Sequence, residues 1–385
     1  MSGNSGAPSD PWAWLGLLKW SLSYTDGTKP SDPNTTFAMS DEDKAFLEAV
    51  MRDGIIDENE RMKTILKDVT EAMDKWKSHT YTEEEEGQVQ DLLDELRDIV
   101  EQIDYARAFA AMKGLDFLLG CVKEGRKLHI PSSIVSICLG IISTMAQNNP
   151  AVQKQLLELS AIGTLSDVFF LEEEEAGSEN GDRNGKLRAR VIQAISSIVR
   201  SYDLGESVFC QLDQSTRLIE AGLGIGSSMN ARTCPILRKR TLFFLNALIT
   251  SDESTRERVR KFNSCIAFLA DNYLSADGEI DNDEREVREM ALEMMIQILE
   301  QGKSVNAILS RKNKIVGMGV QRVSALRGLT DTEEREMAAV ELEHWESLIR
   351  LIAEATPDNE EQGSESNPIM LIDNGTANSK KGLPQ

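Results

Sequence analysis

Three stretches decide the fold of this chain: "LRARVIQAISSIVR" (187–200), "LRKRTLFFLNALIT" (237–250) and "VREMALEMMIQILE" (287–300). Each opens with an apolar residue and an arginine, and then carries apolar residues at the three- and four-residue spacing of an amphipathic helix. Their starts are 50 residues apart, since 237 − 187 = 287 − 237 = 50. Helices that recur at a period of tens of residues are typical of a solenoid, so the sequence predicts a stack of repeated helices.

Other segments extend the same pattern. "VSICLGIISTMAQ" (135–147) reads as an earlier copy in a slightly shifted register, and "QVQDLLDELRDIVEQIDYARAFAAM" (88–112) has one apolar face. No alternating strand pattern of useful length occurs. The predicted fold is all-α, an armadillo-type helical solenoid whose 50-residue period exceeds the roughly 40–47 residues of armadillo and HEAT units, so we expect inserted loops. Long helical surfaces favour protein binding over catalysis.

The composition predicts four parts. Residues 1–39 form a flexible N-terminal arm, 40–84 form N-terminal helices, 85–355 form the repeat core, and 356–385 form a disordered tail without helical periodicity. Within the core, the acidic and Gly-containing stretch 171–186 predicts a solvated loop.

Charge and cysteine usage narrow the class of protein. With 64 acidic and 42 basic side chains, the formal net charge is -22, which argues against nucleic acid as a partner. The five cysteines are odd in number and form no CxxC pair, as is typical of reduced thiols. No window reaches membrane length, and the N-terminus lacks the features of a signal peptide. We therefore expect a soluble monomer in the cytoplasm, with the nucleus as a second option.

The sequence lacks the motifs of nucleotide-binding, metal-binding and catalytic sites. The "NGK" at 184–186 fails the phosphate-loop pattern at two positions, and the acidic stretch 273–284 has Tyr273 where a calcium loop needs its first Asp. His79, His129 and His344 lie far apart in the sequence. We expect no enzyme active site, no cofactor and no metal.

Several segments, taken in order, carry a family resemblance. They are "LLKWSLSYTDGTKP" from Leu17, "MSDEDKAFLEAV", "LLDELRDIVEQIDYA", "QNNP" and "RARVIQAISSIVR". Together they closely resemble the armadillo-type nucleotide exchange factors of the 70-kilodalton heat-shock chaperones, the Fes-one/heat-shock-70-binding-protein family, and especially its plant-like members. The resemblance extends from Leu17 to about residue 300.

This resemblance implies a co-chaperone and not an enzyme. In the family, the armadillo core binds lobe II of the chaperone's nucleotide-binding domain and opens the cleft, so that ADP leaves. Such a protein binds the open state of the chaperone better than the closed one. Linkage then requires ADP to weaken the protein's binding by the same factor by which the protein weakens ADP binding.

The resemblance also implies which residues contact the chaperone. They are Ala106, Gln147, Asn148, Asn149, Arg190, Arg200, Arg238 and Arg240. An alternative stays open, because many arginines of armadillo folds tie adjacent repeats together, and Arg188 and Arg288 occupy equivalent positions. Val135 departs from the family, which usually has Arg there.

The segment "PWAWLGLLKWSLSYTDGTKP" (11–30) holds three of the five tryptophans. The resemblance implies that the arm, through residues 11–24, imitates a substrate in the chaperone's substrate-binding domain and helps misfolded clients leave. The residues expected to do so are Leu17, Leu18, Lys19, Trp20, Ser21 and Leu22. The alternative is a short amphipathic helix packed on the first core helices.

A second function remains open, that of an armadillo-type scaffold or adaptor without exchange activity. Peptide-binding armadillo proteins normally carry a ladder of Asn and Trp on successive long helices. Here Trp12, Trp14, Trp20 and Trp76 lie before the predicted core and Trp345 lies near its end, so that ladder is absent. The sequence therefore favours the exchange factor.

Overall fold

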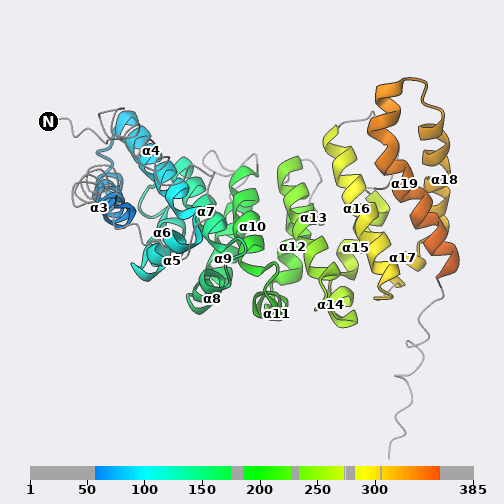
Figure 1. Ribbon diagram of the computed structural model, residues 1–385, viewed down its shortest axis with the longest axis horizontal. Coiled ribbons are helices and arrows are strands. Elements are labelled where there is room, and N and C mark those ends of the chain that lie inside the picture. Colours follow the sequence, from blue (N-terminus) through cyan, green and yellow to red (C-terminus); the bar gives the residue numbers. More distant parts are fainter. Residues whose placement is uncertain are drawn as a thin grey trace, which may run out of the picture. The chain divides into compact units, whose positions relative to one another are not determined.

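The computed structural model describes residues 57–174, 185–226, 234–272, 274, 282–303 and 306–355. Every regular element in these ranges is a helix, so the all-α prediction is confirmed there (Figure 1). The predicted arm and tail lie outside the described residues. The helices are α3 Glu58–Lys77, α4 Glu83–Val100, α5 Ile103–Ala111, α6 Gly114–Glu124, α7 Ser132–Ala146, α8 Pro150–Glu158, α9 Ala161–Glu174, α10 Lys186–Val199, α11 Asp203–Gln211, α12 Ser215–Leu223, α13 Pro235–Thr250, α14 Arg256–Lys261, α15 Asn263–Asn272, α16 Asn282–Glu300, α17 Asn306–Leu309, α18 Lys312–Arg327 and α19 Thr332–Glu354.

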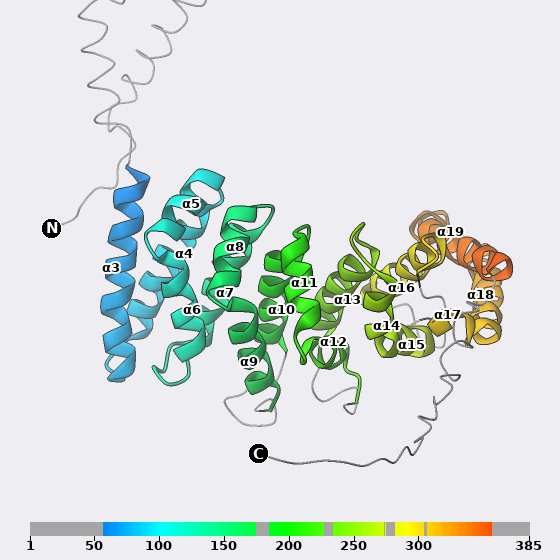
Figure 2. The same cartoon turned by 90° about the horizontal axis from the view of Figure 1, so that it is seen from below.

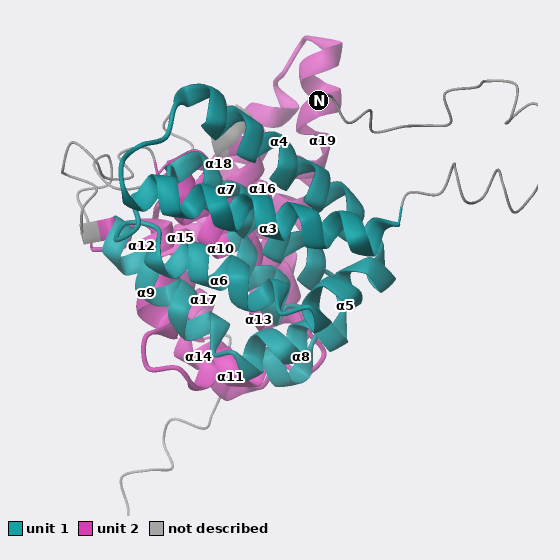
Figure 3. Ribbon diagram, turned by 90° about the vertical axis from the view of Figure 1, so that its left-hand side faces the viewer, with its two compact units in different colours: residues 1–172, 193–205 teal, residues 173–192, 206–385 magenta. Residues whose placement is uncertain are grey.

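The chain divides into two compact units (Figure 3). Unit 1 comprises residues 1–172 and 193–205, and unit 2 comprises 173–192 and 206–385. Helices α9 and α10 each contribute residues to both units. The predicted repeat helices starting at 187, 237 and 287 are found as α10, α13 and α16.

Unit 1 is built on the buried helix α7. Figure 2 shows α3 alongside α4, and α4 packs in turn against α7, which also contacts α6 and α8. Helix α7 is apolar almost all round, as a helix enclosed by neighbours should be. Val135 is among its buried residues, so this departure from the family faces the core.

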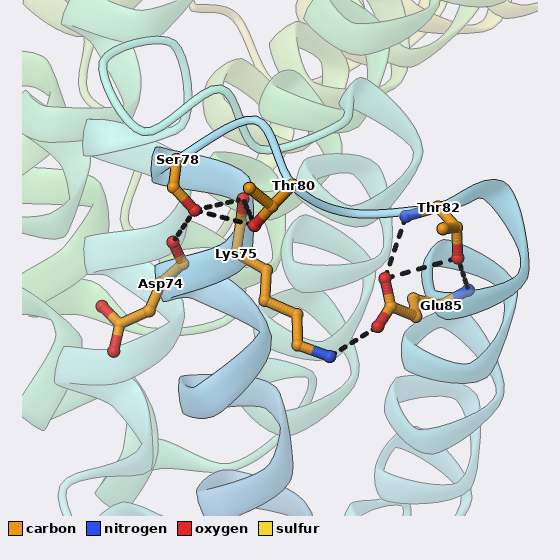
Figure 4. Close-up of polar contacts among 6 residues, drawn as sticks. All are labelled: Asp74, Lys75, Ser78, Thr80, Thr82 and Glu85. Atoms are coloured by element: carbon orange, nitrogen blue, oxygen red, sulfur yellow. Dashed lines mark hydrogen bonds and ion pairs between the residues drawn. The ribbon is translucent and has the colours of Figure 1, made fainter.

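The turn between α3 and α4 shows how local sequence begins a helix (Figure 4). The hydroxyl of Thr82 accepts a hydrogen bond from the Glu85 backbone N–H at 3.2 Å, and the Glu85 carboxylate accepts from the Thr82 N–H at 2.9 Å. This capping box satisfies two N–H groups that the helix leaves unpaired. Lys75 of α3 donates to the same carboxylate at 2.5 Å, which joins the two helices.

Two details differ from the sequence expectation. Residues 88–112 do not form one helix, because α4 ends at Val100 and α5 begins at Ile103, which is 50% exposed. The stretch 171–186 is not solvated throughout, because α9 continues to Glu174 and Glu172 is buried. The Glu172 carboxylate accepts from Arg126 at 2.8 Å; residues 175–184 of the predicted loop lie outside the described residues.

Unit 2 is a succession of long helices with shorter ones beside them. Helix α13 packs against α12 and α16, α16 packs against α19, and α19 packs against α18. Two glycines allow close approach: a Cβ on Gly222 would lie 2.4 Å from the Thr241 hydroxyl, and one on Gly319 would lie 2.8 Å from the Trp345 ring. This unit carries the repeated arginines.

Candidate functional site

The predicted chaperone-binding residues fall into two groups, one in each unit. The unit 1 group comprises Ala106, Gln147, Asn148, Asn149 and Arg200. The unit 2 group comprises Arg190, Arg238 and Arg240. The predicted arm residues, Leu17, Leu18, Lys19, Trp20, Ser21 and Leu22, lie outside the described residues.

Helix α8 brings the unit 1 group together. The turn 147–149 leads from α7 into α8, where Pro150 occupies the first turn without loss because its missing N–H would be unpaired anyway. One turn later, the Gln153 amide donates to the carbonyls of Ser197 at 3.0 Å and Arg200 at 3.1 Å. Helix α8 also packs against α5, which holds Ala106.

Only part of this group is available at the surface. Gln147 and Asn148 are exposed, and Arg200 is half-buried, with a guanidinium pKa lowered by that burial. Ala106 is 1% exposed and Asn149 is 2% exposed. The methyl group of Ala106 therefore packs inside the protein, and a direct contact with a partner has to come from its neighbours.

In unit 2, Arg190 of α10 and Arg240 of α13 share one electrostatic environment. Burial lowers the pKa of the Arg240 guanidinium, and the positive charge of Arg190 lowers it further. Both side chains are half-buried, as is that of Arg238. Guanidinium groups form charge-assisted hydrogen bonds with carboxylates, so these two side chains are suited to contact a carboxylate of a partner.

Two exposed apolar residues flank Arg240, and sequence reasoning missed them. Ile236 is 49% exposed and Phe243 is 46% exposed. Positions 236, 240 and 243 have the i, i+4, i+7 spacing that places side chains on one face of a helix. The sequence carries no clear signal for them, because adjacent residues of this helix can both be buried, as Phe244 and Leu245 are. Phe244 is fully buried.

Two of the repeated arginines are structural, as the alternative interpretation allowed. Arg188 is fully buried, and Arg288 is 6% exposed. The Arg288 guanidinium donates to the Glu341 carboxylate at 2.8 Å and so ties α16 to α19. The helical register explains why Arg188 is buried and Arg190 is not, since positions 188 and 190 point about 200° apart around α10.

Three observations bear on other kinds of site. Within the described ranges, no group of three or more His, Cys, Asp and Glu side chains is placed to hold a metal ion. No described helix has the length and apolar character to cross a bilayer. All five cysteines are free thiols, of which Cys121, Cys138 and Cys265 are buried.

The fold defines a helical-repeat protein, and the mixed basic and apolar face on α13 is a candidate binding surface. Residues 15–109 match the family model described as "Nucleotide exchange factor Fes1". The predicted resemblance to the Fes-one/heat-shock-70-binding-protein family is confirmed; its plant-like character stays a prediction.

Curated relatives carry the name Hsp70-binding protein 1. Those of Macaca fascicularis and Mus musculus are each 26% identical over 220 residues, which is 56% of this chain and 56% and 57% of the relatives. The Homo sapiens protein is 26% identical over 209 residues, 54% of either chain. The chain thus spans about half the length of the curated relatives it matches.

Among solved structures, an engineered protein is 14% identical. The match covers 72% of this chain and 97% of that one, at a TM-score of 0.44. A second engineered protein is also 14% identical. That match covers 83% of this chain and 66% of the engineered one, at a TM-score of 0.45.

Proposed function

We propose that this protein is a co-chaperone, a nucleotide exchange factor that binds the nucleotide-binding domain of a 70-kilodalton heat-shock chaperone and promotes release of ADP. The observation that carries this proposal is the match of residues 15–109 to the nucleotide exchange factor family. The name of the relatives, Hsp70-binding protein 1, supports the same partner. The protein acts by binding and not as an enzyme.

The mechanism is a shift in the chaperone's own equilibrium. The protein binds the open form of the nucleotide-binding domain, through lobe II, better than the closed form, and that difference in affinity opens the cleft. By linkage, the co-chaperone lowers the chaperone's affinity for ADP by the same factor by which ADP lowers the chaperone's affinity for the co-chaperone. No group of the co-chaperone takes part in a reaction.

The α13 face supplies suitable contacts. Ile236 and Phe243 provide apolar anchors, and Arg240 with Arg190 provides a cationic centre for a carboxylate of the partner. Aromatic and arginine side chains contribute most of the energy at such interfaces. In unit 1, Gln147, Asn148 and Arg200 add polar contacts, and the buried Ala106 and Asn149 lie behind them. In unit 2, the half-buried Arg238 lies on α13 two residues before Arg240.

The test is the release of labelled ADP from a cytosolic 70-kilodalton chaperone, followed by stopped flow. The wild-type protein should accelerate release. Arg240→Ala and Phe243→Ala should each raise the concentration needed for half-maximal acceleration about 10-fold or more, as loss of an interface anchor does. The matched controls, Arg327→Ala and Val320→Ala, change exposed residues of α18 and should behave as wild type.

Absence of acceleration with every cytosolic chaperone would leave the scaffold or adaptor function. Equal losses in the test and control variants would show that the α13 face is not the contact. Ala106→Arg is a poor test, because it would force a long cation into the core of unit 1.

We further propose that the arm releases substrate, on the strength of its apolar and extendable sequence. Leu17, Leu18 and Leu22 would enter the groove of the chaperone's substrate-binding domain, with Lys19, Trp20 and Ser21 lying between Leu18 and Leu22 in the sequence. Deleting residues 1–30 should keep ADP release and slow the release of a labelled substrate peptide. The protein would work as a monomer in the cytoplasm, with the nucleus as a second location.

A further inference from the structure

Two histidines that the sequence separates lie together in unit 1. The imidazole rings of His79 and His129 have their centroids 4.0 Å apart and are tilted by 43°. His79 follows α3 and His129 lies in the connection between α6 and α7. Both side chains are exposed, so neither ring is placed by burial in a core.

The backbone does not require histidine at either position. His79 and His129 both have φ of 54°, in the left-handed region that favours Gly or Asn after a helix. The hydrogen bonds are also alike: His79 N–H donates to Trp76 O and the next N–H to Lys75 O, while His129 N–H donates to Arg126 O and the next to Gly125 O. Glycine would form both turns with less strain, so the imidazoles are what histidine adds.

The charges beside these turns are largely balanced. Lys75 is paired with Glu85 at 2.5 Å, Lys127 with Glu124 at 2.9 Å, and Arg126 with Glu172 at 2.7 Å. Lys77 is the remaining cation at the end of α3. A cation that approaches the two rings therefore meets little net repulsion from their surroundings.

We propose that His79 and His129 form a two-imidazole binding site for a divalent transition-metal ion, with water completing the coordination shell. Neutral imidazole suits Cu²⁺, Ni²⁺ and Zn²⁺, whereas Mg²⁺ and Ca²⁺ prefer oxygen ligands. Because both side chains are exposed, each ring can turn a nitrogen toward a shared ion. The first bond then holds the second imidazole at a high effective concentration, which strengthens binding.

The ion would join two parts of unit 1. Helix α3 packs on α4 and α5, and α6 packs on α5 and α7, so the metal ties the end of the first described helix to the α6–α7 connection. Binding to the folded state alone stabilises that state by mass action. The effect should therefore appear as a metal-dependent rise in the melting temperature.

The experiment is a calorimetric titration of tag-free protein with Cu²⁺, Ni²⁺ and Zn²⁺, with electron paramagnetic resonance of the Cu²⁺ form to count nitrogen ligands. The variants are His79→Asn, His129→Asn and the double variant. Asparagine is chosen because it tolerates the left-handed backbone and lacks an imidazole. The control is His344→Gln, which alters the third histidine of the chain, in α19.

We expect one ion per chain with two nitrogen ligands. Each single variant should weaken binding about 10-fold or more, and the double variant little further, because one remaining imidazole forms no chelate. The His344→Gln protein should bind as wild type. Unchanged affinity in both single variants, or loss of binding in His344→Gln alone, would overturn the proposal.

Discussion

Glu341 is a carboxylate enclosed by its own partners in unit 2. It is fully buried and accepts hydrogen bonds from Arg288 and from Arg322, the nearest at 2.8 Å in each case, and from the Trp345 ring N–H at 3.4 Å. Burial alone would raise its pKa, but the hydrogen bonds and charges of the two guanidiniums outweigh it and lower the pKa overall. One residue thus links α16, α18 and α19.

Replacing this carboxylate should be costly. Glu341→Leu leaves two buried guanidiniums without a counter-charge, and we expect a loss of about 3–5 kcal/mol in the free energy of unfolding. Urea unfolding followed by circular dichroism measures it. The control is Arg327→Ala, which breaks an exposed ion pair with Glu346 and should cost no more than about 1 kcal/mol. Similar losses in the two variants would contradict the assignment.

Low pH should remove the stabilisation that the Glu341 carboxylate provides. A carboxylate whose folded-state pKa lies below its unfolded value stabilises the protein above the unfolded pKa, about 4.3 for Glu, and the stabilisation is lost as the pH falls through the folded pKa. The free energy of unfolding should therefore fall more steeply below about pH 4.3 in wild type than in Glu341→Gln. Parallel pH profiles of the two proteins would show that Glu341 carries no such linkage.

At the scale of the element, α18 and α19 approach closely because of one glycine. A Cβ on Gly319 would lie 2.8 Å and 2.9 Å from atoms of Trp345 and Ile349, closer than side chains tolerate. Gly317, on the same helix, has open space at its Cβ position. The two glycines thus have different reasons to be present.

Alanine at these two positions should act in opposite directions. Gly319→Ala should destabilise the protein by about 1–3 kcal/mol, because the overpacked contact outweighs the gain in helix propensity. Gly317→Ala should stabilise it by up to about 1 kcal/mol, because only the propensity changes. Thermal and urea unfolding measure both. A stabilised Gly319→Ala would mean that α18 and α19 are not packed through this residue.

Elements were predictable where their signals are local. The period of 50 residues located α10, α13 and α16, and the all-α class followed from the same spacing. The break between α4 and α5 was not predictable, because no Gly or Pro interrupts the helical pattern at Glu101 and Gln102. The burial of Glu172 depends on Arg126, which is 46 residues away, and local composition does not show such a pairing.

The candidate site was predictable in residue type but not in exposure. Repetition pointed to arginines at equivalent positions, yet packing alone decides that Arg188 and Arg288 are buried while Arg190 and Arg240 reach the surface. Ile236 and Phe243 were counted with the apolar ladder, since a sequence does not say which apolar residue of a helix is exposed. Only the fold shows that His79 and His129 lie side by side.

At the scale of the whole molecule, two compact units with their own buried residues predict unequal responses to a local defect. In repeat proteins, stability is carried by each repeat and its immediate neighbours, so damage in one unit need not unfold the other. Cys121 and Cys138 report on unit 1 and Cys265 reports on unit 2, since all three are fully buried. Burial, and to a smaller extent the negative charge of Glu220, raises the pKa of Cys265 to about 12. This thiol therefore stays protonated and unreactive in the folded state.

Pulsed thiol labelling in rising urea, read by mass spectrometry, therefore separates the units. In Glu341→Leu, Cys265 should become labelled at a lower urea concentration than in wild type, while Cys121 and Cys138 keep their wild-type midpoints. Cys210 and Cys234 are half-buried and should label earlier in both proteins, which provides an internal control for reagent activity. If the three buried thiols shifted together in the variant, the two units would unfold as one cooperative body, and the defect at Glu341 would be felt throughout the chain.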